Sequence, residues 1–469
     1  MHTSTTSTVP LVSWTAAQLL EATQGYWLND QAPNTEIKRI LTDSRDAEAG
    51  DAFLALKGER FDAHAFITQV AEQGCQVAIV SQPIDAEICQ LVVPDTRLAL
   101  GQLGAYRRAQ NPQLKVIALT GSSGKTTTKE MLGSILSRIA PTLVTRGNLN
   151  NDLGVPVMLL ELRPEHQYAV MELGASHQGE IDYTSNLVQP LVAGIINIGT
   201  AHLGEFGGRD GICRAKSEIY AHIAPNGTSI VPAADDFADS IRQAVQTEQV
   251  LSFGAGGEIF ATEIELQAQS ATFKLNTPQG VRQVNLPFAG EHNVQNSTAA
   301  AAFALAIGIS LDDIVLGLEQ AVGAKGRLNF IQQGHHLLID DTYNANPTSM
   351  RAAAEVLAQQ EGVRVMVMGD IGELGSSAAQ QHYMLGRDLV SVKGLNFVVA
   401  VGEFAPAAQE GARSTQYGKK MQAFLTQEQA LPFLLSLIET HQPQSMSFLF
   451  KGSRYTHMET LMADLMEKL

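Results

Sequence analysis

The sequence predicts an α/β protein built from three domains. Its 469 residues exceed what one hydrophobic core usually serves, and at about 150 residues per domain they suggest roughly three. From about residue 96 onward, continuous apolar runs alternate with helix-compatible stretches, which is typical of buried parallel strands. A second series of such runs follows residue 326. We therefore place the domains at residues 1–95, 96–326 and 327–469.

The first domain is predicted to be a small α/β unit. Residues 14–25 and 64–74 each carry a helical apolar stripe that stops at a glycine, and the strand-like run CQVAIVS follows the second. Residues 42–66 are polar and punctuated by glycine. We interpret them as mostly loops, and loops held on a scaffold are where binding residues collect.

The central domain is predicted to hold a mostly parallel sheet, because KVIALTG, YAVMELGA, VAGIINIG and GTSIVPA resemble buried strands. Residues 260–288 alternate in polarity and indicate antiparallel strands with a turn at Pro278-Gln279-Gly280. Residues 297–311 are apolar but too few to span a bilayer, so they predict a buried helix. In the third domain, HHLLIDD, VRVMVMGD, LNFVVAVGE and MSFLFKGS predict a doubly wound, Rossmann-like sheet.

Charge and cysteine content exclude several classes of protein. The 48 acidic residues outnumber the 32 basic ones, giving a net charge of -16 without a dense basic cluster, so a nucleic-acid partner is not expected. The three cysteines, Cys75, Cys89 and Cys213, form no Cys-x-x-Cys pair, which favours reduced thiols. The N-terminus shows no signal-peptide pattern. We therefore expect a cytoplasmic protein without membrane insertion.

Residues 120–130, TGSSGKTTTKE, resemble a phosphate-binding loop with shortened spacing. The usual loop places four residues between its first glycine and the Gly-Lys-Thr, whereas only two serines stand there in this chain. The segment still supplies small residues for close approach, amides at a helix N-terminus, a lysine for the terminal phosphates and a hydroxyl for Mg²⁺. The alternative is a glycine-rich turn between strand and helix with an exposed lysine. The predicted nucleotide-binding residues in this loop are Gly121, Ser122, Ser123, Gly124, Lys125, Thr126 and Thr127.

Polar residues close several predicted strands. In open parallel sheets, ligands bind beyond the carboxyl ends of strands, so these residues are better site candidates than residues in mid-helix. They are Glu172, His202, Asp341, Asp370 and Lys451.

Two of these strand-end residues fit a metal site beside the nucleotide loop. Taken alone, Glu172 equally fits a solvated strand end, but Mg²⁺ prefers a few carboxylates and shares the phosphates. A lone histidine is more often structural than a metal ligand. A ligand role for His202 is favoured because its strand should be near that of Glu172. Lys216, by itself, looks like an ordinary exposed helical lysine.

Nine motifs over nearly the whole chain resemble the Mur ligases, the ATP-dependent amide-forming enzymes of peptidoglycan precursor synthesis. In chain order they are TDSR, GSSGKTTTKE, GNLNNDLGVP, MELGASHQGE, AHLGEFGG, GEHNVQNSTAA, DDTYNANP, MGDIGELG and KGSR. Together they are far more specific than any one alone, and the shortened loop is the family's form of the ATP site. YNANP and GNLNND resemble the branch that adds a D-alanyl-D-alanine dipeptide.

The resemblance implies an ATP-dependent carboxylate-amine ligase. The γ-phosphoryl group of ATP would pass to the terminal carboxylate of UDP-N-acetylmuramoyl-tripeptide, and the amine of D-alanyl-D-alanine would attack the resulting acyl phosphate. The products would be the UDP-N-acetylmuramoyl-pentapeptide, ADP and phosphate. The first domain would bind the UDP-sugar, the central one ATP, and the third would close on ATP and bind the dipeptide, which would shield the acyl phosphate from water. We expect the working form to be a monomer.

The resemblance also implies roles for individual residues at the ATP and metal sites. Lys125 and the loop amides would hold the β- and γ-phosphates, with Thr126 and Glu172 on one Mg²⁺. His202 and Lys216 match residues associated with a second Mg²⁺, the lysine as a carbamate formed with CO₂. The other nucleotide contacts would come from Asn293, Asn296, Arg327, Asp341 and Tyr343.

Three groups of residues match the family's substrate-binding regions. The UDP-sugar region matches Asp43, Ser44, Arg45 and Lys57. The path of the muramoyl peptide matches Asn148, Asn150, Asn151, Ser176 and His177. The incoming dipeptide would lie near parts of MGDIGELG and near Asn344 and Asn346.

Two alternatives remain open at this point. One is another ligase of the same family, which adds an amino acid to a shorter nucleotide-linked peptide or glutamate to folate. YNANP and GNLNND argue against it, as does the TDSR-bearing first domain, which folate-type ligases lack. The other is a regulatory module that uses ATP only as a switch. The sequence also leaves open whether the tripeptide ends in diaminopimelate or lysine, and whether Lys216 is carbamylated.

Overall fold

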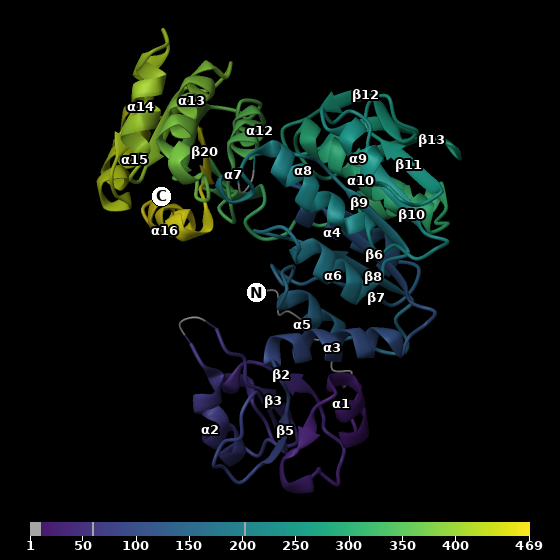
Figure 1. Ribbon diagram of the computed structural model, residues 1–469. Coiled ribbons are helices and arrows are strands. Elements are labelled where there is room, and N and C mark those ends of the chain that lie inside the picture. Colours follow the sequence, from purple (N-terminus) through teal and green to yellow (C-terminus); the bar gives the residue numbers. More distant parts are fainter. Residues whose placement is uncertain (1–10, 59–60, 201–202) are drawn as a thin grey trace. The chain divides into compact units, whose positions relative to one another are not determined.

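The computed structural model describes residues 11–58, 61–200 and 203–469, which form two compact units (Figure 1). The first unit consists of Met1–Ala118, Ala140–Gly174 and Glu180–Leu191, and the second of Leu119–Ile139, Ala175–Gly179 and Val192–Leu469. The predicted boundaries at residues 95 and 326 stay a prediction, because each compact unit combines segments from separate parts of the chain.

The N-terminal part of the first unit is a small α/β structure. Its main elements are α1 (Ala16–Thr23), β1 (Tyr26–Trp27), β2 (Ile40–Leu41), β3 (Ala52–Leu54), α2 (Ile67–Glu72), β4 (Val77–Val80), β5 (Cys89–Val92) and α3 (Thr96–Ala109). The strands form one sheet in the order β1-β5-β4-β3-β2, parallel except for β1. Successive residues of β4 enter different apolar clusters, Val77 with Trp14 and Ala78 with Ile67. Both faces of this sheet are therefore covered.

A second, mostly parallel sheet contains the strands predicted for the central domain, and this part of the fold prediction is confirmed. Its strand order is β11-β10-β9-β6-β8-β7. The central run Val116–Leu119 is fully buried, as expected for strands with both faces covered. The elements are β6 (Lys115–Thr120), α4 (Lys125–Ser137), β7 (Thr142–Val144), α5 (Gly154–Leu160), β8 (Tyr168–Glu172), α6 (Glu180–Val188), β9 (Val192–Ile195), α7 (Leu203–Phe206), α8 (Arg209–Ser217), β10 (Thr228–Pro232), α9 (Ala238–Ala244) and β11 (Gln249–Phe253).

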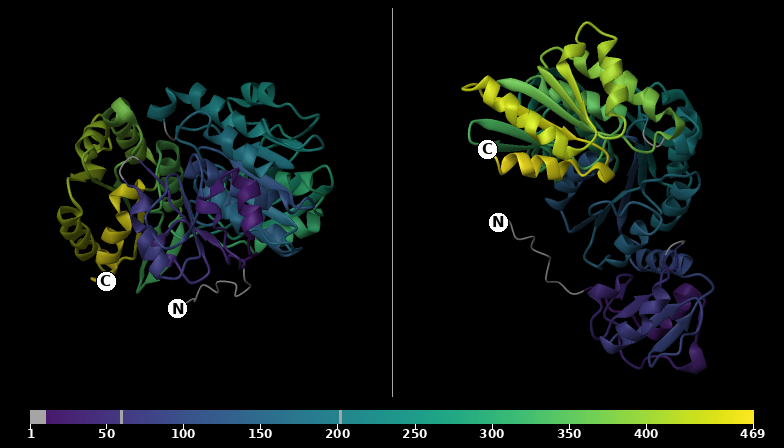
Figure 2. Two further views of the ribbon diagram at one scale, coloured as in Figure 1. Left: turned by 60° about the horizontal axis from the view of Figure 1, so that its bottom comes forward. Right: turned by 90° about the vertical axis from the view of Figure 1, so that its left-hand side faces the viewer.

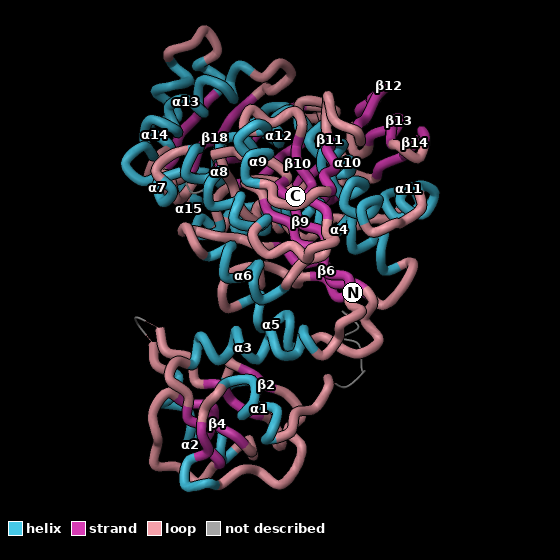
Figure 3. The backbone as a smooth tube through the Cα atoms, turned by 45° about the vertical axis from the view of Figure 1, so that its right-hand side comes forward, coloured by secondary structure: helices cyan, strands magenta, loops and turns pink. Residues whose placement is uncertain are grey.

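The alternating segment of the second unit forms the predicted antiparallel strands. They are β12 (Phe260–Leu266), β13 (Ala271–Thr277) and β14 (Gly280–Leu286). Thr277 pairs with Gly280 across the predicted turn. Two helices follow, α10 (Glu291–Ala306) and α11 (Leu311–Glu319), and α11 packs beside β14 (Figure 3). Helix α10 is largely buried, as predicted, although it ends at Ala306.

The C-terminal sheet has the order β15-β16-β20-β17-β18-β19 and is parallel except for β15. Its elements are β15 (Asn329–Gln333), β16 (His336–Asp340), α12 (Pro347–Leu357), β17 (Val363–Gly369), α13 (Ala378–Ser391), β18 (Phe397–Val401), α14 (Ala405–Arg413), β19 (Met421–Phe424), α15 (Gln427–His441), β20 (Met446–Lys451) and α16 (Met458–Met466). The doubly wound prediction is confirmed, because α12 to α14 pack on one face and α15 and α16 on the other (Figure 2).

The order of these strands determines where a ligand can bind. The chain advances from β16 through β17 and β18 to β19, which places the connecting helices on one face. After β19 the chain returns, and β20 lies between β16 and β17. The helix that follows β20 packs on the opposite face of the sheet from the helices that follow β16 and β17. Such a switch opens a crevice at the carboxyl ends of the strands, here after Asp340, Gly369 and Lys451.

Helices α13 and α14 approach each other closely at two glycines, Gly386 and Gly411. We therefore expect Gly386→Ala to lower the free energy of unfolding by about 1–3 kcal/mol, because the added methyl group overpacks the contact. A Cβ at Gly386 would lie 1.9 Å from the carbonyl oxygen of Ala408, and one at Gly411 would lie 1.9 Å from that of Tyr383. Urea denaturation measures the effect. Gly323→Ala is the control, because its Cβ would meet no atom closer than 3.5 Å. Equal losses in the two variants would contradict the proposed crossing.

None of the helices formed by the described residues is long and apolar enough to cross a membrane.

Candidate active site

A cavity of about 660 Å³ lies within the second unit. Its volume falls in the range of roughly 300–1,000 Å³ that is usual for small-molecule sites. The phosphate-loop residues Ser122 to Thr127 border it, together with the segment after β9, the start of α10 and the strand ends of the C-terminal sheet. The crevice expected from the strand order and the glycine-rich loop therefore open on the same space.

The phosphate loop joins β6 to α4 and is held in shape by Asn197. The backbone N–H of Ser122 donates to the carbonyl oxygen of Asn197 (3.1 Å), and that of Ser123 donates to its side-chain Oδ1 (3.0 Å). The Nδ2 of Asn197 donates in turn to the carbonyl oxygen of Ser123 (2.9 Å). Sequence reasoning missed Asn197, although it closes the run VAGIINIG and the strand-end rule would have selected it.

Gly124 combines a positive φ with a close neighbour. Its φ is 78°, and a Cβ at this position would lie 2.2 Å from the Oδ1 of Asn296. Asn296 donates through Nδ2 to the Oδ1 of Asn293 (3.0 Å), whose own Nδ2 donates to the carbonyl oxygen of Ala289 (2.8 Å). The two asparagines predicted to contact the nucleotide are therefore buried and bonded to each other, and one of them rests against the loop.

Two cationic side chains, those of Lys125 and Arg327, lie near the start of α4. The Nζ of Lys125 donates to the carbonyl oxygen of Gly121 at 2.7 Å. The Nη2 of Arg327 is 3.5 Å from the Oγ1 of Thr126, and its guanidinium carbon lies 4.4 Å from the centre of the Tyr343 ring. Two positive charges and a helix N-terminus thus meet at one wall of the cavity, which suits an anionic ligand.

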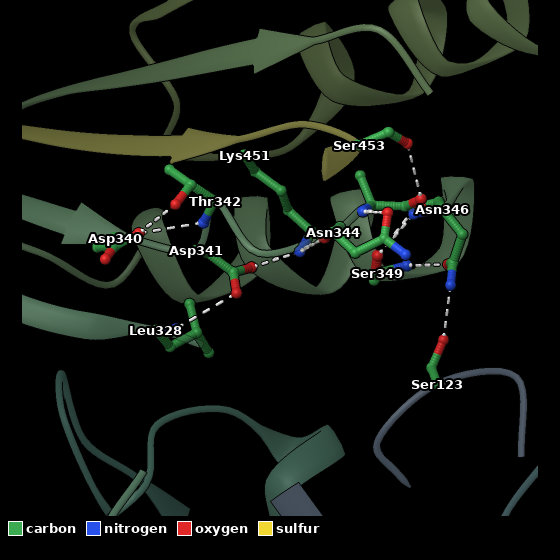
Figure 4. Close-up of polar contacts among 11 residues, drawn as sticks. Ser123, Leu328, Asp340, Asp341, Thr342, Asn344, Asn346, Ser349, Lys451 and Ser453 are labelled. Carbon is green, nitrogen blue, oxygen red and sulfur yellow. Dashed lines mark hydrogen bonds and ion pairs between the residues drawn. The ribbon is translucent and has the colours of Figure 1, made fainter. Parts of the chain in front are cut away.

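A buried ion pair joins two strand ends of the C-terminal sheet (Figure 4). The Nζ of Lys451 lies 2.7 Å from the Oδ2 of Asp341 and donates to the carbonyl oxygen of Asn344 at 2.9 Å. Burial lowers the pKa of Lys451, while the charge of Asp341 acts in the opposite direction. The sequence placed Lys451 at a strand end without giving it a role. No pattern in the neighbouring sequence identifies Lys451 as part of an ion pair, because its partner Asp341 belongs to a distant segment.

Asn346 connects α12 to the phosphate loop. Its Oδ1 accepts from the backbone N–H of Ser349 (2.9 Å), which caps the helix, and its Nδ2 donates to the Oγ of Ser123 (2.9 Å) (Figure 4). The N-terminus of α12 and that of α4 therefore both border the cavity.

The predicted metal ligands are distributed over both units. Glu172 belongs to the first unit, where it is buried and accepts from the Nδ2 of Asn150 at 2.8 Å. Thr126 and Lys216 belong to the second unit, and His202 lies outside the described residues. The described residues contain no group of three or more His, Cys, Asp or Glu that could hold a metal ion.

Lys216 is not the exposed helical lysine that its local sequence indicates. It is 2% exposed. Helix α8 buries the face that carries Ile212 and Ala215, and Lys216 follows at the same side of the helix. A short stretch such as RAKSE gives no sign of this burial.

Most predicted substrate residues lie at the surface. The Nε of Arg45 donates to the Oδ1 of Asp43 (2.8 Å), which lowers the pKa of Asp43 to about 2, and Ser44 lies between them. Lys57 is 3.7 Å from Asp62 in an exposed pair.

The predicted peptide-binding residues are divided between the units. Asn148, Asn150 and Asn151 belong to the first, and the Oδ1 of Asn151 accepts from the backbone of Gly154 (2.8 Å). Ser176 and His177 belong to the second, where the Nε2 of His177 lies 3.6 Å from Glu205. Asn344 and Asn346 line the cavity, as do Asn293, Asn296, Arg327 and Asp341.

Comparison with known proteins supports the resemblance inferred from the nine motifs. Residues 36–118 match the catalytic domain of the Mur ligase family, residues 119–304 the Mur ligase middle domain, and residues 326–454 the glutamate ligase domain of Mur ligases. The chain is 41% identical over 461 residues to the UDP-N-acetylmuramoyl-tripeptide--D-alanyl-D-alanine ligase of Escherichia coli (strain K12), a match that covers 97% of this chain and 99% of that protein.

Solved structures give the same result. A crystal structure of MurF from Acinetobacter baumannii matches with a TM-score of 0.95 and 76% identity, over 98% of this chain and 100% of that one. The MurF ligase from Thermotoga maritima in complex with ADP matches with a TM-score of 0.79 and 25% identity, over 92% of this chain and 97% of that one. On these matches, the chain belongs to the Mur ligase family.

Proposed function

We propose that the protein joins D-alanyl-D-alanine to UDP-N-acetylmuramoyl-tripeptide, with ATP as the source of energy, and so forms a peptidoglycan precursor. The observation that carries this proposal is a single cavity bordered both by the phosphate loop and by the strand ends of the C-terminal sheet. A nucleotide and an acceptor can meet there. The names of relatives that match almost the whole chain specify the substrates.

The first task of the site is to bring two anions together. A carboxylate and an ammonium do not condense readily in water, so the γ-phosphoryl group of ATP must first convert the tripeptide's carboxylate into an acyl phosphate. Lys125 and the amides at the start of α4 would hold the β- and γ-phosphates and stabilise the charge that develops during transfer. Arg327 would add a second positive charge from the C-terminal segment.

The buried asparagines are proposed to bind the nucleoside end. Asn293 and Asn296 border the cavity near the start of α10, and Asp341 and Tyr343 lie on the segment that follows β16. Each asparagine has an amide that can both donate and accept, which suits the edge of a base.

The proposed metal is Mg²⁺, which prefers oxygen ligands and shares phosphates with a few protein groups. Thr126 and Glu172 would bind one ion, and His202 with Lys216 a second. Mg²⁺ would neutralise phosphate charge during transfer. Lys216 as an ammonium has no lone pair for a metal, so its role as a ligand requires the proposed carbamate. Its burial also distinguishes it from an ordinary surface lysine.

The remaining substrate assignments are also proposals. Asp43, Ser44, Arg45 and Lys57 would bind the UDP-sugar, and the exposed guanidinium of Arg45 suits a diphosphate. The residues proposed to line the path of the muramoyl peptide are Asn148, Asn150, Asn151, Ser176 and His177. The dipeptide would bind near Asn344 and Asn346. We propose a monomer in the cytoplasm as the working form.

Phosphate release tests this function directly. The assay contains Mg-ATP, D-alanyl-D-alanine and the tripeptide nucleotide, supplied separately with diaminopimelate or lysine as its third residue, and each component is omitted in turn. We expect sustained release only with all three, together with a pentapeptide product in the mass spectrum. Equal release without the dipeptide would instead favour a module that uses ATP as a switch.

Asn346→Ser tests the link between α12 and the phosphate loop. Serine still caps the helix but is too short to reach Ser123, so we expect little change in stability. Loss of one hydrogen bond worth about 1 kcal/mol should raise the KM for ATP about five-fold. Steady-state kinetics and thermal unfolding measure the two effects. The link has no role in ATP binding if the KM for ATP is unchanged in this variant.

A further inference from the structure

The phosphate loop runs along the segment that follows β9, and Asn197 continues this pairing beyond the ends of the strands. Strands β6 and β9 are neighbours in the sheet. The N–H of Ile196 donates to the carbonyl oxygen of Thr120 (2.8 Å), and that of Ser122 donates to the carbonyl oxygen of Asn197 (3.1 Å). One residue further, the side-chain amide of Asn197 bonds both backbone groups of Ser123. The side chain thus holds the loop as the backbone of a neighbouring strand would.

The segment that carries Asn197 is itself fixed by side chains. The backbone N–H of Ile198 donates to the Oδ2 of Asp235 (2.8 Å), and the carbonyl oxygen of Ile198 accepts from the Nη2 of Arg209 (2.7 Å). The guanidinium of Arg209 is held in turn by an ion pair with Asp236 at 2.6 Å. Asn197 therefore supports the phosphate loop from a position that its own neighbours fix.

These contacts determine which amides of the loop serve a phosphate. In the usual phosphate loop, the backbone N–H groups cradle the phosphates. In this chain the N–H groups of Ser122 and Ser123 donate to Asn197 instead. The first hydrogen bond of helix α4 runs from the N–H of Thr128 to the carbonyl oxygen of Gly124 (2.9 Å), so the helix does not use the N–H groups of its first turn. An anion at the start of α4 would meet those N–H groups, while Asn197 determines where the loop lies.

We propose that Asn197 is a positioning residue for the phosphates of ATP. It engages the amides of Ser122 and Ser123, and it leaves the β- and γ-phosphates to Lys125 and to the N–H groups at the start of α4. This inference rests on the proposed ligase function. The loop is two residues shorter than the usual one, and the side chain of Asn197 holds it against the end of the sheet. A loop fixed in this way presents the γ-phosphoryl group to the carboxylate in a constant position.

Two variants of Asn197 remove its side-chain bonds to Ser123 in different ways. Asn197→Leu keeps the branched shape of the side chain, and Asn197→Ser keeps a polar group that is too short to reach Ser123. Gln90 supplies a matched control, because its amide also accepts from the N–H of one residue, Ile84 (2.9 Å), and donates to the carbonyl oxygen of that residue (2.7 Å). Gln90 lies on β5 in the first unit and does not belong to the cavity lining. Gln90→Met should therefore lower stability without affecting the use of ATP.

The experiment separates ATP from the other two substrates. We expect both Asn197 variants to lose about 100-fold in kcat/KM for ATP, the effect of a misplaced reacting group, while the KM values for the tripeptide nucleotide and D-alanyl-D-alanine stay unchanged. Calorimetric titration with Mg²⁺ and the β,γ-imido analogue of ATP, without an acceptor, should show binding about ten-fold weaker than in the parent. Gln90→Met should match the parent in both measurements. Thermal unfolding measures the stability of all three variants.

The outcomes separate the two proposals. A parent protein that binds the analogue but forms no pentapeptide would refute the ligase function, and the titration alone would then decide the role of Asn197. Asn197 variants that bind the analogue as tightly as the parent, with an unchanged kcat/KM for ATP, would refute only that role. Equal losses in the Asn197 variants and in Gln90→Met would also refute it, because the losses would then follow from lower stability.

Discussion

Lys125→Ala is expected to lower kcat at least about 1,000-fold while the protein stays folded, because electrostatic stabilisation of a transferring phosphoryl group is commonly worth this much. The lysine stands at the first position of α4, and its Nζ reaches the carbonyl oxygen of Gly121 within the loop. It is the positive charge that the loop itself contributes to the cavity wall. Phosphate release with all substrates measures the loss.

Two further variants sharpen this test. Lys125→Met retains the length and apolar stem of the side chain, so its loss should equal that of alanine if charge is what matters. Lys468→Ala changes an exposed lysine near the C-terminus and should leave kcat as it is. Full activity of Lys125→Ala would show that the lysine of the phosphate loop is not needed for the reaction.

Removing one partner of the Asp341–Lys451 pair is expected to be the most destabilising of the proposed changes. Both side chains are buried, with 9% and 4% of their surfaces exposed, so either single substitution leaves an uncompensated charge. Such a loss costs about 3–5 kcal/mol. We therefore expect Lys451→Met and Asp341→Leu each to lower the free energy of unfolding by that amount in urea denaturation.

The double variant separates stability from activity. Lys451→Met combined with Asp341→Leu replaces the pair by apolar side chains of similar volume, and should recover much of the stability. It should stay inactive, since Asp341 and Lys451 both border the cavity. A double variant less stable than both single ones would contradict the proposed role of the pair as a costly buried contact.

The fold class could be predicted because buried parallel strands are continuous apolar runs. The apolar run Val363–Gly369 predicts β17 in this way. The turn after Thr277 predicts the antiparallel pair that it connects. Strands β15 and β19 were not predicted, since they lie at the two edges of the sheet and are only partly buried. Their sequences, NFIQQ and MQAF, carry no long apolar run.

Local pattern alone predicts the candidate site only where its residues stand together in the chain, whereas scattered lining residues such as Asn293 and Asp341 are implied by the family resemblance. The phosphate loop is one continuous segment and was found from its glycines and lysine. Asn197 meets this loop from 74 residues away and Asn346 from 223, so no local pattern shows those contacts. The burial of Lys216 is likewise set by neighbouring elements. The roles of the individual site residues stay predictions.

If this cavity uses ATP to activate a carboxylate, as we propose, one oxygen of that carboxylate must end on the released phosphate. The tripeptide nucleotide is prepared with ¹⁸O in its terminal carboxylate and turned over with Mg-ATP and D-alanyl-D-alanine. An acyl phosphate transfers one carboxylate oxygen to phosphorus, so the released phosphate should carry one ¹⁸O atom for each pentapeptide formed. Unlabelled phosphate, released while pentapeptide accumulates, would rule out an acyl phosphate intermediate.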